Sequence, residues 1–247
     1  MKFHAALSLL VLLSGLAAQT GQAIAGLPTP DMDERTLQEK YHIASTEEGL
    51  IGALQHQESV VRSFAATKLA NDGDKAAIRP ILDALAAETI PGVKIILATA
   101  AARLDSPEGF SALKSMCEDR SWSPGSPTMR MVAAQTMVIV VDRQECLSDI
   151  LEVLRSALAP DDFSAPVIAL NLLPRFKQVS PSQLDEMRDL AAVYLKSGQP
   201  AYRMVASQCV RDLGGPWAIS QLRAALDAER EEAIRNVIAN SLFSVRQ

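Results

Sequence analysis

The sequence predicts an all-α protein arranged as an α-solenoid of about six helical hairpins, on the basis of a tandem repeat and of the composition. A short motif recurs in which an apolar residue, usually followed by a basic residue, precedes an Ala-rich turn of helix. The six copies start 32 to 37 residues apart, at Val61, Val93, Met129, Ala165, Tyr202 and Ile234. Such periods are typical of stacked helical hairpins. Aromatic residues make up only 4% of the chain, which favours closely packed helices over a sheet.

Each hairpin is expected to lie between residues that disfavour helix. Residues 31–44 predict a short polar helix that caps the array, and Ser45 or Thr46 is a suitable N-cap for the first hairpin. Apolar residues then recur at spacings of three and four, as on one face of a helix. The breaks between the later helices are rich in Pro, Gly, Asn, Asp and Ser and lie at residues 71–74, 91–92, 105–107, 119–127, 174 and 214–216.

The first 25 residues have the features of a secretory signal peptide. Lys2 precedes a short apolar run, Leu7–Leu16, and Ala23-Ile24-Ala25 is a small-x-small site that predicts cleavage after Ala25. The run is shorter than the about 20 residues that span a bilayer, which favours a cleaved signal over the alternative, an uncleaved anchor. We therefore expect a periplasmic or secreted protein with no stable membrane insertion. Its expected parts are a signal peptide (1–25), a leader with a capping helix (26–45) and a repeat domain (46–247).

The net charge argues against one class of partner, and the cysteines are considered for a disulfide. The formal net charge is −5, so the chain lacks the basic surface of a nucleic-acid binder. Cys117, Cys146 and Cys209 are an odd number for an oxidising compartment. Cys209 falls in the middle of a helix on its buried face, where a thiol behaves as a small hydrophobic group. Cys117 near the end of one first helix and Cys146 near the start of the next are expected to lie about a helix length apart, which disfavours a disulfide between them.

Enzymatic chemistry has little support in the sequence. After the signal peptide the only histidines are His42 and His56, and neither belongs to a pattern that could hold a catalytic metal. A thiol nucleophile needs a nearby base or a positive environment, which the sequence does not specify. We therefore expect no catalytic residue, no metal site and no cofactor.

Three copies of the motif resemble a known family. The segments VRSFAATKLANDGD from Val61, VKIILATAAARLD from Val93 and YRMVASQCVRDLGG from Tyr202 are similar to the second helix and following turn of HEAT repeats, in particular the short HEAT-like repeats of the phycobilisome-lyase type. The resemblance covers residues 46–246. It implies a right-handed superhelix and, in an exported bacterial-type HEAT repeat protein, a scaffold that binds other proteins. The copy from Ala165 departs from the pattern, because Pro166 replaces the basic residue.

The same resemblance leaves a second function open, a lyase- or chaperone-like subunit that acts on a chromophore-bearing or modified protein. Export disfavours a bilin lyase, because chromophore attachment to phycobiliproteins is expected inside the cell. The expected function is therefore that of a non-enzymatic scaffold or adaptor in an extracytoplasmic compartment, with another protein or a peptide as its partner.

Basic residues occupy one register position in five of the six copies, namely Arg62, Lys94, Arg130, Arg203 and Arg235. One interpretation is a stripe that binds anionic partners. The other is a structural ladder, in which each basic side chain meets carboxylates in the turns or the end of a helix. We favour the ladder, since HEAT-like arrays commonly use this position structurally.

Two rows of side chains on the second helices predict the contact surface. Positions two residues after each motif start are apolar in the four central copies, and positions six residues after it are uncharged hydrogen-bonding residues throughout. Residues four apart share a helix face, and second helices line the inner curve in HEAT-like arrays, so the rows predict a groove for an extended peptide or an amphipathic helix. The alternative is that they hold stacked repeats together. The predicted partner-binding residues are Ile95, Met131, Gln135, Val167, Asn171, Met204 and Gln208, together with Trp122 in a Pro- and Gly-rich loop.

Overall fold

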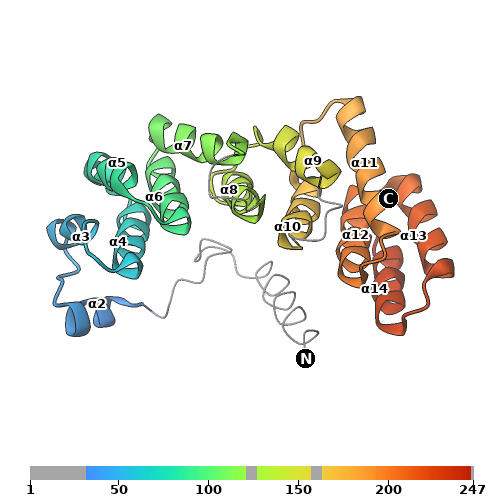
Figure 1. The fold of residues 1–247 in the computed structure, drawn as a ribbon, viewed down its shortest axis with the longest axis horizontal. Helices are drawn as coiled ribbons and strands as arrows, with labels where there is room; N and C mark the ends of the chain where they lie inside the picture. The colour runs from blue at the N-terminus through green and yellow to red at the C-terminus, as the bar shows by residue number, and fades with distance from the viewer. Residues whose placement is uncertain (1–31, 121–126, 157–162, 246–247) are drawn as a thin grey trace. The chain divides into compact units, whose positions relative to one another are not determined.

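The computed structural model describes residues 32–120, 127–156 and 163–245 (Figure 1). Within these ranges the chain forms thirteen α-helices and two short 3-10 helices, without a strand. The predicted all-α class is therefore confirmed. The predicted signal peptide, the Gly26–Pro30 leader and Trp122 lie outside the described residues.

The chain divides into two compact units. The first comprises Met1–Ser115 with Ile139–Asp142, and the second comprises Met116–Val138 with Arg143–Gln247. The predicted repeat domain, 46–247, includes parts of both, and each unit is described by itself.

The first unit is a set of helix pairs preceded by a single short helix. Its elements are α2 (Glu34–Tyr41), α3 (Glu47–Ala53), α4 (Ser59–Asn71), the 3-10 helix η2 (Lys75–Ala77), α5 (Ile78–Ala87), α6 (Pro91–Arg103) and the larger part of α7 (Pro107–Glu118). Helix α3 packs against α4, α5 packs against α6, and α4 packs against α6. The second helices of two successive pairs are thus in contact. The helix predicted within residues 31–44 is present as α2, whose Leu37 is fully buried in the core of this unit.

The second unit continues the same alternation of helix pairs. Its elements are α8 (Pro127–Ile139), α9 (Leu147–Ser156), α10 (Ser164–Leu172), the 3-10 helix η3 (Leu173–Arg175), α11 (Pro181–Leu195), α12 (Pro200–Leu213), α13 (Gly215–Ala228) and α14 (Glu232–Phe243). Pairs form between α9 and α10, α11 and α12, and α13 and α14. Helix α12 contacts both α10 and α14, and α11 contacts α9. Successive pairs in this unit are therefore in contact with one another.

Proline and short polar side chains fix where the helices begin. Five of them, α6, α7, α8, α11 and α12, have proline as their first residue, where its fixed φ suits a helix and its missing N–H is not needed. Thr46 caps α3, since its side chain accepts a hydrogen bond from the N–H of Gly49. Ser180 and Gln183 form a capping box at α11. The segment at Pro91-Gly92, which the sequence predicts as a turn, is the first turn of α6.

Close packing in the first unit depends on small residues. Gly109 of α7 lies directly against α6, because a Cβ atom added at Gly109 would stand 2.6 Å from both the Ala101 Cβ and the Ala102 backbone nitrogen. Helix α6 itself is buried on all sides from Ile95 to Ala102. The alanine-rich composition therefore allows the helix backbones to approach closely.

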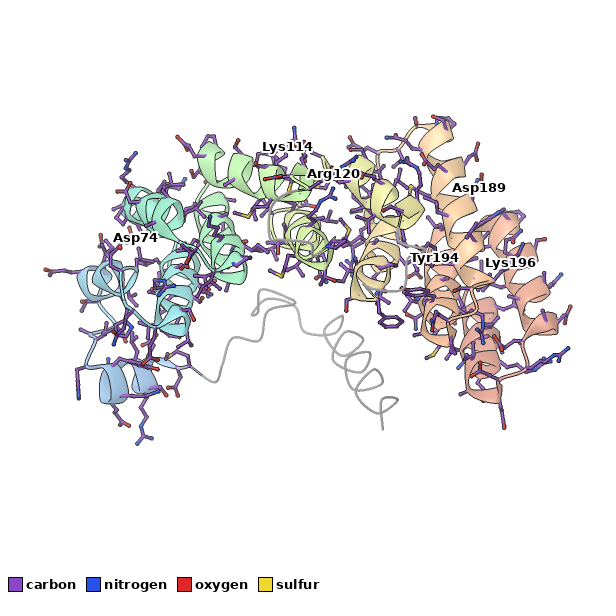
Figure 2. All side chains as sticks on the ribbon, in the orientation of Figure 1. Asp74, Lys114, Arg120, Asp189, Tyr194 and Lys196 are labelled. Atoms are coloured by element: carbon purple, nitrogen blue, oxygen red, sulfur yellow. The ribbon has the colours of Figure 1, made fainter. Side chains whose placement is uncertain are left out.

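Buried polar side chains join successive pairs in the second unit. The Tyr194 hydroxyl on α11 donates a hydrogen bond to the Leu154 carbonyl of α9 over 3.0 Å (Figure 2). The Ser207 and Ser241 hydroxyls of α12 and α14 lie 3.3 Å apart. Because a hydrogen bond requires a particular orientation of donor and acceptor, these contacts fix the position of each helix pair against the next more closely than apolar packing alone.

Candidate partner-binding surface

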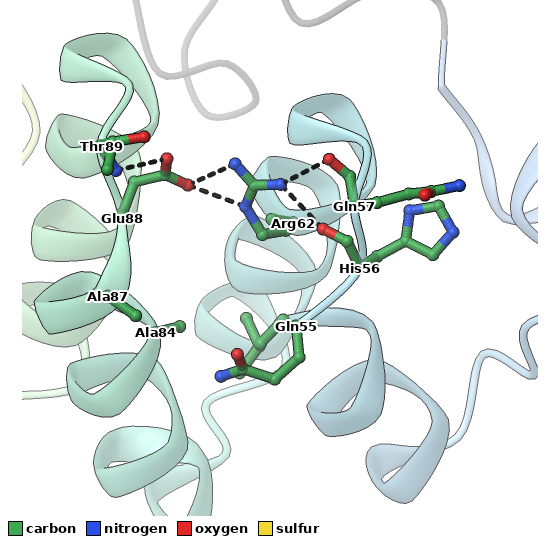
Figure 3. A pocket seen from close by; sticks show the side chains of 9 residues that line it. Gln55, His56, Gln57, Arg62, Ala84, Ala87, Glu88 and Thr89 are labelled. Atoms are coloured by element: carbon green, nitrogen blue, oxygen red, sulfur yellow. Dashed lines mark hydrogen bonds and ion pairs between the residues drawn. The ribbon is translucent and has the colours of Figure 1, made fainter.

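Arg62, the first basic residue of the register, is held between two successive helix pairs of the first unit (Figure 3). Its Nε and Nη2 donate to the Glu88 carboxylate over 2.8 and 2.6 Å, and its Nη1 donates to the carbonyls of His56 and Gln57. The second Glu88 oxygen accepts the N–H groups of Thr89 and Ile90. One arginine thus joins the turn that precedes its own helix to the turn of the following pair.

Arg203 repeats this arrangement in the second unit. It donates to Glu229, which lies 26 residues further along the chain, as Glu88 does from Arg62. It also donates to the carbonyls of Ser197 and Gly198, six and five residues before it, and Arg62 binds carbonyls at the same two offsets. Glu229 in turn accepts the next two backbone N–H groups, as Glu88 does. The two copies of the motif therefore share side-chain geometry as well as sequence.

Other members of the basic register also have internal partners. Arg130 donates from Nε to the Cys117 carbonyl over 2.8 Å, and its Nη2 lies 3.7 Å from Asp149 and 3.9 Å from Glu152. Arg235 donates to carbonyls at the end of α13. Lys94 has no ion pair among the described residues. The ladder interpretation is confirmed for Arg62, Arg130 and Arg203, which face carboxylates of the fold, and Arg235 meets the end of a helix as that interpretation also allows.

A pocket of about 260 Å³ surrounds the Arg62–Glu88 pair, lined by Leu54, Gln55, His56, Gln57, Arg62, Ala84, Ala87, Glu88 and Thr89 (Figure 3). Its volume is below the usual range of small-molecule sites. The guanidinium at its wall already donates to a carboxylate and to two carbonyls. The pocket therefore offers an incoming anion no uncompensated positive charge.

The apolar row of the predicted contact surface is largely buried. Ile95 and Met131 have 0% exposure and Val167 has 4%, and only Met204 keeps part of its surface accessible. Side chains without accessible surface cannot contact a partner, so the prediction that these three form an exposed apolar strip is wrong. Their burial agrees with the alternative, in which this position packs the helices together.

The polar row is more accessible, and its hydrogen bonds are made within single helices. Asn171 is exposed and Gln135 and Gln208 are half-buried. Asn171 donates from Nδ2 to the Val167 carbonyl one turn earlier over 2.9 Å, which leaves its carbonyl oxygen to accept from another molecule. Thr99, the member of this row on α6, is fully buried and donates to the Ile95 carbonyl in the same way. The accessible part of the predicted surface therefore lies in the second unit.

Helix α14 extends this accessible part with residues that the sequence prediction missed. Asn236, Asn240 and Phe243 are exposed and recur at spacings of four and three, so they share one face of the helix. Phe243 has 94% exposure, the largest among the large apolar side chains of the described residues. The sequence signal was present, because Asn236 and Asn240 occupy the same two rows. We use the term amide face for Asn171, Met204, Gln208, Asn240 and Phe243.

Groups that could carry out chemistry are few in the part of the chain that the structure describes. No group of three or more His, Cys, Asp or Glu side chains there is placed to hold a metal ion. All three cysteines are buried, and burial raises the pKa of the Cys209 thiol, so its reactive thiolate form is disfavoured. Nor is any described helix both long and apolar enough for a membrane span. No protein-family model matches the chain, and no curated protein sequence matches it.

Proposed function

We propose that this protein is an exported, right-handed α-solenoid of HEAT-like hairpins that binds another protein. The observation that best supports the repeat family is the shared geometry of Arg62 and Arg203, because the same three contacts recur at the same sequence offsets in two copies of the motif. The contacts between α10, α12 and α14 support stacking of the second helices.

The amide face is the proposed contact surface. Its side chains present carbonyl and amide groups of Asn171, Gln208 and Asn240 beside the apolar groups of Met204 and Phe243. Amides can donate to and accept from the backbone of an extended peptide, while a methionine adapts to the shape of apolar side chains. None of the five residues carries a charge, so the partner would be recognised by hydrogen bonding and apolar contact. The three buried cysteines give no support to a thiol-dependent lyase.

Export is the second part of the proposal. It is supported by the charged start, the apolar run and the small-residue site of the first 25 residues. Expression in a secreting bacterium should yield a chain whose amino terminus is Gly26, as measured by mass spectrometry of the extracytoplasmic fraction. A chain found only in the cytoplasm with residues 1–25 intact would contradict this part alone.

The contact surface can be tested by placing a photo-reactive amino acid at Gln208 in the exported protein. A protein that crosslinks there is identified by mass spectrometry, purified, and its Kd is measured for the wild type and for Met204→Glu. Burying a new charge at the interface should weaken binding at least tenfold. The matched control is Ala224→Glu at an exposed position of α13, which adds the same charge to a first helix and should leave Kd unchanged. Equal Kd values for wild type and Met204→Glu would refute the proposed surface.

A further inference from the structure

Three buried sulfur atoms meet in the second unit. The Cys117 thiol at the end of α7 lies 3.5 Å from the Met137 sulfur of α8, and the Cys146 thiol just before α9 lies 3.1 Å from the same sulfur. All three side chains have 0% exposure. Two thiols that contact the same sulfur atom at these distances must lie near each other.

This proximity corrects the sequence prediction that the two cysteines are about a helix length apart. That prediction assumed that α7 and α9 lie side by side and parallel, which places the end of one far from the start of the other. In the structure the end of α7 meets the start of α9 instead. Arg120 pairs with Glu152 over 2.8 Å, and Arg130, which binds the Cys117 carbonyl, also faces Asp149 in the first turn of α9.

We propose that Cys117 and Cys146 form a disulfide when the chain folds under oxidising conditions. The arrangement differs from that of Cys209, which is buried on α12 without a neighbouring cysteine in the described residues. A disulfide here would join the end of α7 to the start of α9 and close a loop of about 30 residues around α8. The thiols already share a buried site, so forming the bond requires no new burial.

The oxidant in this proposal is a small-molecule or protein disulfide. The thiolate of one cysteine attacks that disulfide, forms a mixed disulfide and releases one thiol of the oxidant. The thiolate of the second cysteine then displaces the other thiol of the oxidant and forms the Cys117–Cys146 bond. Two electrons pass from the cysteine pair to the oxidant, and the two protons lost by the pair are carried by the two released thiols.

Burial determines when the bond can form. The hydrogen bond with Cys146 and burial raise the pKa of the Cys117 thiol, and neither thiol can be reached by an oxidant in the folded chain. Oxidation is therefore expected during folding and not afterwards. Folded reduced protein should be oxidised far more slowly than protein that refolds from denaturant in the same oxidant.

The test uses the full chain refolded in a mixture of oxidised and reduced glutathione, then denatured and alkylated with and without prior reduction. Without reduction one cysteine per chain, Cys209, should be alkylated, and after reduction all three. Cleavage after Lys114, Arg120, Arg143 and Arg155 separates Cys117 and Cys146, so trypsin should release them as one disulfide-linked pair of peptides. The Cys209→Ala variant, as a control, should show no alkylation before reduction.

Three results would overturn the proposal. The first is alkylation of all three cysteines in the oxidised sample. The second is a bridge that contains Cys209. The third is protection of Cys117 and Cys146 that a copper(I) chelator reverses and a thiol reductant does not, because the three sulfurs would then be a site for a soft metal ion.

Discussion

Replacing Glu88 with glutamine should destabilise the protein strongly, although the two side chains have almost the same shape. The Glu88 carboxylate accepts two hydrogen bonds from Arg62 and two from backbone N–H groups, and its side chain is only 2% exposed. A glutamine amide has one acceptor oxygen, so its NH₂ group must face either the guanidinium or the two N–H groups. In both orientations donors face donors, and a charge that is 16% exposed loses its counterion.

The magnitude follows from the burial of the pair. Breaking a buried ion pair by removing one partner costs about 3–5 kcal/mol. The lower end applies to Glu88→Gln, because Arg62 keeps its bonds to the carbonyls of His56 and Gln57. A loss of about 3 kcal/mol lowers the urea midpoint by roughly 1–3 M for typical slopes.

The assay is urea unfolding followed by far-ultraviolet circular dichroism. The matched control is Glu39→Gln, which makes the same chemical change in the Arg35–Glu39 pair, whose side chains are 78% and 64% exposed. That change should cost less than about 0.5 kcal/mol. A double-mutant cycle with Arg62→Met then isolates the coupling between Arg62 and Glu88. Equal midpoints for the two glutamine variants would show that the Arg62–Glu88 contact does not hold successive pairs together.

Three further predictions concern the same fold. Burial would raise the pKa of Glu88, but hydrogen bonds from Ile90, Arg62 and Thr89 outweigh it and lower the pKa. Its stabilising contribution should therefore be complete above about pH 4.5, the unfolded-state value, and the stability difference from Glu88→Gln should shrink as the pH falls below it. Gly109→Ala should destabilise the protein by about 2 kcal/mol, because the added Cβ overlaps α6. Gly52→Ala should instead stabilise α3 by about 0.5–1 kcal/mol, because a Cβ there meets no atom within 4 Å. Equal urea midpoints for the two variants would contradict this prediction. Tyr194→Phe should cost about 1–3 kcal/mol by leaving the Leu154 carbonyl without its donor, and an unchanged midpoint would show that water replaces the hydroxyl.

The repeat pattern was sufficient to predict the helices and the role of the arginines. Both depend on residues close together in sequence, because proline starts the helices at Pro181 and Pro200 and Arg203 reaches carbonyls five and six residues behind it. Even the distant partner, Glu229, lies at an offset set by one repeat length. A local sequence pattern that recurs in tandem is therefore enough to predict the helix starts and the arginine contacts.

The exposed face of each second helix could not be read from the same pattern. Ile95 and Thr99 occupy the two predicted rows on α6, and both are fully buried because every residue between Lys94 and Arg103 is apolar or small. A helix that is apolar on all sides is buried on all sides, and its periodicity indicates no outer face. The proximity of Cys117 and Cys146 was also not predicted from the pattern. It depends on the path of the chain between α8 and α9, which spacing within a helix does not determine.

Burial along the second helices of the second unit indicates where a partner has room to bind. In α8 and α10 nearly every residue after the first turn is buried, whereas α14 buries only Ile234, Ile238 and Ser241. Helix α12 is intermediate and leaves Met204 and Gln208 partly accessible. Since binding energy comes from surface that is accessible before association, the amide face should contribute most of its affinity at α12 and α14. The two helices are in contact, and in the proposed contact the exposed Phe243 ring would provide the apolar anchor that the buried Ile95, Met131 and Val167 cannot supply.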